Sequence, residues 1–197
     1  MFAANTAAMT IAMTLDAAGA FNALARSRQW ATRMDAGLAF QAPELHDVLA
    51  LWNQIAQPGR LPSRGQFTAR LLKPSLRHLG IVGIEAPPGC ARRFRNRYVG
   101  SAVTAIFGEL TGLCPEDFLP PALLPRTIAA YEAVLAGGGP ARVLTRFQHS
   151  KADYLAAEFF GGPLAEDGIT PNMILTVTHV SRPSEGDADA WRLDPAA

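Results

Sequence analysis

Several residue types and motifs are scarce in this sequence, and each absence narrows the range of functions. Of 197 residues, two are cysteine and four are histidine. Cys90 and Cys114 form neither a disulfide framework nor a metal-ligand spacing. The formal net charge of +1 removes the electrostatic argument for a nucleic-acid partner, and no apolar run reaches the roughly 20 residues of a membrane helix. We therefore expect a reduced, cytoplasmic protein with no metal, no nucleic-acid partner and no membrane partner.

The motifs of common enzyme classes are also missing. Ser63 lies in Leu-Pro-Ser-Arg-Gly, which lacks the first glycine of a nucleophile elbow. The glycines at 137–139 follow an expected helix and precede a strand, whereas a phosphate-binding loop leads from a strand into a helix. His149 and Asp153 flank an expected turn, where surface positions are typical of these residue types. We expect no catalytic residues.

Enough apolar sequence is present for a folded core. Apolar residues make up 49% of the chain and charged residues 18%, which argues against general disorder. The length fits one domain with extra segments. We divide the chain into a weakly ordered leader or accessory helix at 1–41, a domain with an N-terminal flanking helix at 42–181, and a loose tail at 182–197. The leader lacks the basic start of a secretory signal, since its first basic residue is Arg26.

An amphipathic helix is expected over residues 43–55, where apolar residues recur at helical spacing. A proline opens it and Pro58 ends the pattern. Its wide apolar stripe suits packing on a sheet or on a second copy of the chain. We predict a homodimer interface formed by Leu45, Leu49 and Trp52.

Five further segments predict strands, because they are rich in β-branched and aromatic residues and are bounded by turn residues. They are residues 79–85, 91–99, 141–149, 153–162 and 172–181. A helical insert separates the first two from the last three, and its longest helix is expected over 123–136. This order predicts an α+β fold with a five-stranded antiparallel sheet and helices on one face. The gap between sheet and helices suits a small ligand.

The second of these strands alternates clearly between apolar and charged residues. Phe94 and Tyr98 are expected on the buried face, and every second residue from 93 to 97 is an arginine on the other face. A row of arginines is typical of a solvated edge strand. The alternative is a site for an acidic partner or an anionic ligand.

Short motifs between residues 51 and 180 form a collinear series. Residues 94–102 read Phe-Arg-Asn-Arg-Tyr-Val-Gly-Ser-Ala, and Phe-Gly and Leu-Thr-Gly follow at 107–112. Leu-Pro-Ser-Arg stands at 61–64 and Pro-Leu-Ala-Glu-Asp-Gly at 163–168. Together these motifs resemble a PAS-like family that is common in alphaproteobacteria. The chain departs from that family after the Leu-Pro-Ser-Arg connector, where relatives have an Asp-Pro pair and this sequence has Thr68-Ala69.

The resemblance implies a PAS fold and a non-enzymatic sensory or regulatory module that binds a small molecule or a signalling protein. A haem needs an axial ligand such as histidine, which in haem-binding PAS domains tends to come from the long helix, and residues 123–136 contain none. Photoactive flavin domains carry their reactive cysteine in an Asn-Cys-Arg sequence, whereas Cys114 stands in Leu-Cys-Pro. Neither haem nor flavin is supported.

Six residues are expected to surround the gap between sheet and helices. They are Ile106, Phe107, Tyr131, Phe147, Leu175 and His179. A second function class is a small cone-shaped α+β enzyme, a hydrolase or isomerase, that works through His179 or His149. Convergence of ionisable side chains in one apolar cavity would identify it. A third is a structural adaptor with a filled core.

Overall fold

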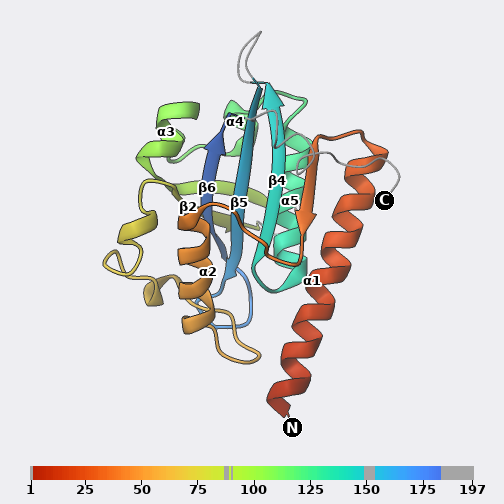
Figure 1. Ribbon diagram of the computed structural model, residues 1–197, viewed down its shortest axis with the longest axis vertical. Coiled ribbons are helices and arrows are strands. Elements are labelled where there is room, and N and C mark those ends of the chain that lie inside the picture. The colour runs from red at the N-terminus through yellow and green to blue at the C-terminus, as the bar shows by residue number, and fades with distance from the viewer. Residues whose placement is uncertain (1, 87–88, 90, 149–153, 183–197) are drawn as a thin grey trace.

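A six-stranded antiparallel sheet forms the centre of the fold (Figure 1). The computed structural model describes residues 2–86, 89, 91–148 and 154–182. The strands lie in the order β1-β4-β5-β6-β2-β3. Their bounds are β1 Thr32–Asp35, β2 Leu79–Glu85, β3 Arg93–Val99, β4 Ala141–Gln148, β5 Tyr154–Leu164 and β6 Met173–Ser181. The fold class is α+β, as expected.

The five strands predicted from the sequence are neighbours in this sheet, and β1 adds a sixth at the outer edge of β4. Residues 32–35 pair with residues 142–145 of β4. Strands β2 and β3 come before the helical insert and β4 to β6 after it, so the two groups meet where β6 pairs with β2. This arrangement differs from the predicted sheet by one added edge strand.

Helices cover both faces of the sheet. Figure 1 shows α2 (Pro43–Ile55) on the near side of the sheet and α5 (Leu124–Gly137) behind it. The short helices α3 (Ser101–Phe107) and α4 (Pro115–Phe118) complete the insert. Between the flanking helix and β2, residues 71–78 contain a single 3-10 turn, Lys73–Ser75. The helices of the insert therefore lie on one face, as expected, and the separately predicted flanking helix α2 covers the other.

Each face of the sheet has its own hydrophobic core, because strands β2, β5 and β6 present apolar side chains on both sides. One core joins α2 to β2, β5 and β6, and Leu45, Val48 and Trp52 are its helical part. Leu49 packs against the same core. Leu45 and Trp52 are thus buried inside one chain, which corrects their assignment to a dimer interface. The apolar stripe of the helix covers the sheet instead.

A β-bulge corrects the predicted faces of β3. Ile81 pairs with Tyr98, but Val82 pairs with Asn96, so Arg97 is an extra residue in β3. One extra residue reverses the alternation beyond it. Phe94 is fully buried as expected, whereas Tyr98 is 40% exposed.

The leader carries α1 (Phe2–Ser27) as well as β1. The helix lies along α5, and Figure 1 shows its N-terminal end extending past the rest of the protein. The hydroxyl of Thr14 donates a 3.0 Å hydrogen bond to the carbonyl of Gly137 at the end of α5. No helix in the described part of the chain has the length and hydropathy to cross a membrane. Of the predicted tail, residues 183–197 lie outside the described residues.

A candidate ligand cavity between the sheet and two helices

A cavity of about 180 Å³ lies between the sheet and the helices of the insert. The inner faces of all six strands contribute, and α3 and α5 form the opposite wall. The α5 segment contributes residues three or four positions apart, which is the spacing of one helical face. These residues are Leu123, Arg126, Thr127, Ala130, Tyr131 and Val134.

Aromatic rings form much of the cavity wall. Phe107 on α3 and Phe147 on β4 pack with ring centroids 5.4 Å apart. Tyr131 packs on Phe94 with ring centroids 5.0 Å apart. Phe159 also contributes to the lining. Such walls favour an apolar or aromatic occupant.

A few polar groups interrupt this apolar surface. Burial raises the pKa of Tyr131 to about 12, so its phenol stays a neutral donor. Within the described residues, the Tyr131 hydroxyl, the side-chain amide of Asn96 and the hydroxyl of Thr176 have no hydrogen-bond partner. Among the described lining residues, Arg126 is the one that carries a formal charge. Burial lowers its pKa.

Three of the six predicted pocket residues line this cavity, namely Phe107, Tyr131 and Phe147. Ile106 lies on α3 but is not part of the described lining. Leu175 belongs to the core under α2, because Ile174 and Thr176 take the cavity side of β6. His179 is four residues after Leu175 in the same strand, so it shares the face of Leu175 and also lies on the α2 side. His149 lies outside the described residues.

His179 forms a small polar cluster with the start of α2. Its Nδ1 lies 2.6 Å from Oε1 of Glu44, and Nδ1 of His78 lies 3.7 Å from the same oxygen. Burial raises the pKa of Glu44, but its hydrogen bonds and the two imidazoles outweigh burial, so the pKa lies below its usual range. The cluster ties α2 to β6 and is separate from the cavity.

The arginines near β3 are paired within the chain. Arg95 donates two hydrogen bonds to Glu85, at 2.7 and 3.1 Å, and Arg97 reaches the same carboxylate at 3.5 Å. Arg92 pairs with Glu132. The strand lies at the edge of the sheet, as expected. Its positive charge is thus largely compensated by this chain's own carboxylates.

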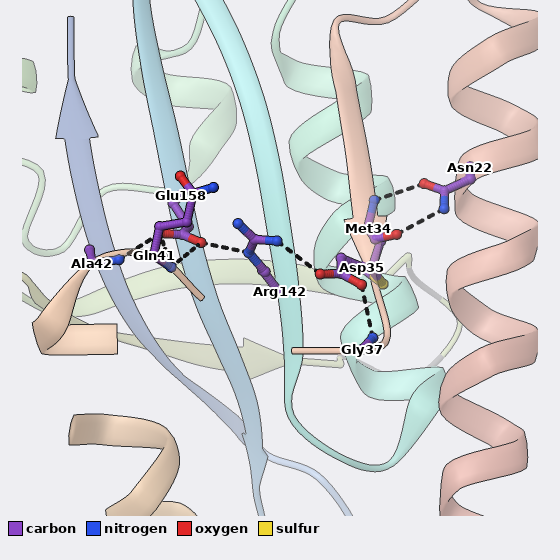
Figure 2. A network of polar contacts seen from close by, with 8 residues as sticks. All are labelled: Asn22, Met34, Asp35, Gly37, Gln41, Ala42, Arg142 and Glu158. Carbon is purple, nitrogen blue, oxygen red and sulfur yellow. Dashed lines mark hydrogen bonds and ion pairs between the residues drawn. The ribbon is translucent and has the colours of Figure 1, made fainter. Parts of the chain in front are cut away.

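A buried charge network on the α2 side was not foreseen from the sequence (Figure 2). Arg142 donates to Glu158 at 2.5 Å and to Asp35 at 2.9 Å. The Glu158 carboxylate also accepts the backbone N–H groups of Gln41 and Ala42 at 3.1 Å. The network therefore joins the β4-β5 pair to β1 and to the linker before α2, which lie more than 100 residues earlier in the sequence. A charged residue inside an apolar run, as in Ala-Ala-Glu-Phe-Phe, was the available signal.

Two of the family-like motifs meet in space, although they are about 100 residues apart. The N–H of Leu61 donates to the carbonyl of Gly168, and the N–H of Ala165 donates to the carbonyl of Pro62, both at 2.9 Å. Gly168 has φ +77, and a Cβ there would lie 2.5 Å from the Arg60 guanidinium. The connector at 61–64 is thus clamped against the β5-β6 turn.

Comparisons with known proteins place few constraints on function. No protein-family model matches the chain, and no curated protein matches it. A solved structure described as an RNA-binding light-oxygen-voltage receptor matches with 16% identity and a TM-score of 0.37. The match covers 64% of this chain and 37% of that one, so this chain spans well under half of the receptor's length. No group of residues suited to a metal ion occurs in the described part of the chain.

Proposed function

We propose that this chain is a PAS-type sensory module of the family its motifs resemble, and that it binds a small molecule in the cavity described above. The observation that carries this proposal is the cavity itself. It is apolar, it has a volume of about 180 Å³, and it lies in the gap between sheet and helical insert. Polar groups without partners inside an apolar wall are typical of ligand sites.

A signal from the cavity has a short route to the outside of the domain. Helix α5 presents one face to the cavity and packs α1 on another. Gly137 permits that contact, because a Cβ there would lie 3.3 Å from the backbone of Thr14. In this proposal a ligand shifts α5, α1 moves with it, and a protein partner in the cytoplasm reads the change. Light scattering with size-exclusion chromatography tests whether that partner is a second copy of the chain.

The enzyme alternative has no specific observation in its favour. The ionisable side chains on the described cavity wall are Arg126 and Tyr131. His179, one of the two histidines that motivated the alternative, lies on the opposite face of the sheet and does not reach this space. The other, His149, lies outside the described residues.

Native mass spectrometry of the purified protein, with its absorbance spectrum, tests the proposal directly. We expect a bound small molecule that is lost in Tyr131→Trp, because the larger ring fills the cavity. Tyr98→Trp is the matched control, since Tyr98 lies 40% exposed on the other face and should leave occupancy unchanged. Equal occupancy in Tyr131→Trp and the wild type would refute the site.

A further inference from the structure

Among the described residues, the cavity lining carries one formal charge, that of Arg126, and no counter-ion for it. Arg126 donates a 3.0 Å hydrogen bond to the backbone carbonyl of Arg146, but no described carboxylate lies within ion-pair distance of it. By contrast, Arg142, which is buried on the other side of the sheet, is paired with two carboxylates. A guanidinium has five N–H donors, so most of those of Arg126 are open to another partner.

The position of Arg126 at the start of a helix makes its unpaired charge less favourable still. It is the third residue of α5, where the helix dipole disfavours a cation and favours an anion. Burial of a charge is also unfavourable unless the charge is paired. A carboxylate at this point of the cavity would offset both effects and would accept a bidentate hydrogen bond from the guanidinium.

The volume of the cavity indicates the size of its occupant. An apolar protein cavity of about 150 Å³ holds a benzene molecule, and this cavity has a volume of about 180 Å³. The two volumes are of the same order, so a single aromatic ring is of a suitable size for this cavity. The Phe107–Phe147 pair, 5.4 Å between centroids, offers a ring a wall to pack against.

From these three observations we infer that the ligand is a single-ring aromatic carboxylate, with its ring among the aromatic side chains and its carboxylate on Arg126. This inference rests on the proposed function, because it assigns a chemical class to the occupant of the same cavity. The interaction with Arg126 distinguishes an acid from a neutral compound of the same shape.

Benzoate and benzamide separate charge from shape, because both have one ring and the same number of heavy atoms. In an NMR titration of the full chain we expect benzoate to bind at least about tenfold more tightly than benzamide, as one charge-assisted hydrogen bond requires. Arg126→Gln should abolish this preference, so that the variant binds the two compounds about equally. Arg126→Lys should retain part of it, and Arg70→Gln, an exposed arginine outside the cavity, should retain it fully.

Two results would overturn the inference: equal binding of benzoate and benzamide by the wild type, or an undiminished preference in a folded Arg126→Gln protein. A third result would separate the two proposals. If the wild type binds benzamide and benzoate equally and Tyr131→Trp blocks both, the ligand cavity is supported and only the assignment of an anionic ligand is refuted. Should neither compound bind and native mass spectrometry find no ligand, the proposed function falls as well.

Discussion

Removal of the Glu158 carboxylate should destabilise the protein strongly. The side chains of Arg142 and Glu158 are only 5% and 4% exposed. In Glu158→Ala, Arg142 keeps its 2.9 Å contact with Asp35 but loses its buried partner. The N–H groups of Gln41 and Ala42 lose their acceptor at the same time.

Breaking a buried ion pair by removing one partner costs about 3–5 kcal/mol. The total free energy of unfolding of a typical domain is about 5–15 kcal/mol, so this change is large enough to measure and small enough to leave many domains folded. Urea unfolding followed by circular dichroism gives the difference, provided that the slope with denaturant is unchanged.

A double variant separates two causes of the stability loss, namely the lost ion pair and the buried charge left without a partner. Arg142→Met with Glu158→Leu removes both charges, and such replacements are often neutral or stabilising. We therefore expect the double variant to lose less stability than Glu158→Ala alone. Glu166→Ala is the control, because Glu166 is exposed in the β5-β6 turn and should change stability by no more than about 0.5 kcal/mol. A loss in Glu158→Ala as small as that of the control would refute the reasoning, since it would mean that the carboxylate is solvated.

Three further changes test the packing and the charges elsewhere. Gly162→Ala should cost about 1–3 kcal/mol, because a Cβ at Gly162 would lie 2.6 Å from the Trp52 ring; an unchanged melting temperature would contradict this packing. Gly19→Ala should stabilise the protein by about 0.5–1 kcal/mol, since a Cβ there meets nothing within 4 Å; a loss of stability would argue against α1 as a helix. Burial raises the pKa of Asp35, but hydrogen bonds from Arg142 and from backbone amides outweigh burial, so the pKa lies below its usual range. The ionised Asp35 carboxylate therefore stabilises the fold at neutral pH, and this stabilisation is lost as the pH falls through the lowered pKa. We expect Asp35→Asn to be less stable at neutral pH and to lose less stability than the wild type on acidification. Identical pH dependence of unfolding in the two proteins would contradict this.

The sequence located most elements because their local patterns agree with the final structure. Strand β2 runs over Leu79–Glu85, the residues expected for it, and α2 begins at Pro43 as expected. Strand β1 was missed because four residues, Thr-Arg-Met-Asp, carry too little pattern by themselves. They form a strand because β4 offers them a pairing edge, which is a tertiary effect.

Which face a residue occupies was harder to predict than which element it belongs to. Strand β6 is central and buried on both sides, so its sequence lacks the alternation that would tell Ile174 from Leu175. In β3 the extra residue Arg97 reverses the face of Tyr98. Local sequence does not reveal a bulge whose cause is the register with a neighbouring strand.

The most informative residue of the candidate site was missed for a similar reason. An arginine on an amphipathic helix is usually exposed, and nothing around Arg126 in the sequence suggests otherwise. Its place in the cavity follows from how α5 lies against β4, where its guanidinium reaches the carbonyl of Arg146.

The added strand β1 has a consequence for assembly. An open sheet offers unpaired backbone groups at its two outermost strands, and foreign strands attach there. Here β1 is the outermost strand on one side, and the Asn22 side chain pairs with the backbone N–H and carbonyl of its Met34. Beyond the end of β1, Arg126 donates to the next carbonyl of β4, that of Arg146. On the opposite side Asn96 exchanges backbone hydrogen bonds with Gly112 and Leu113. Because backbone groups of both outermost strands are paired within the chain, the sheet is poorly suited to growth by strand addition.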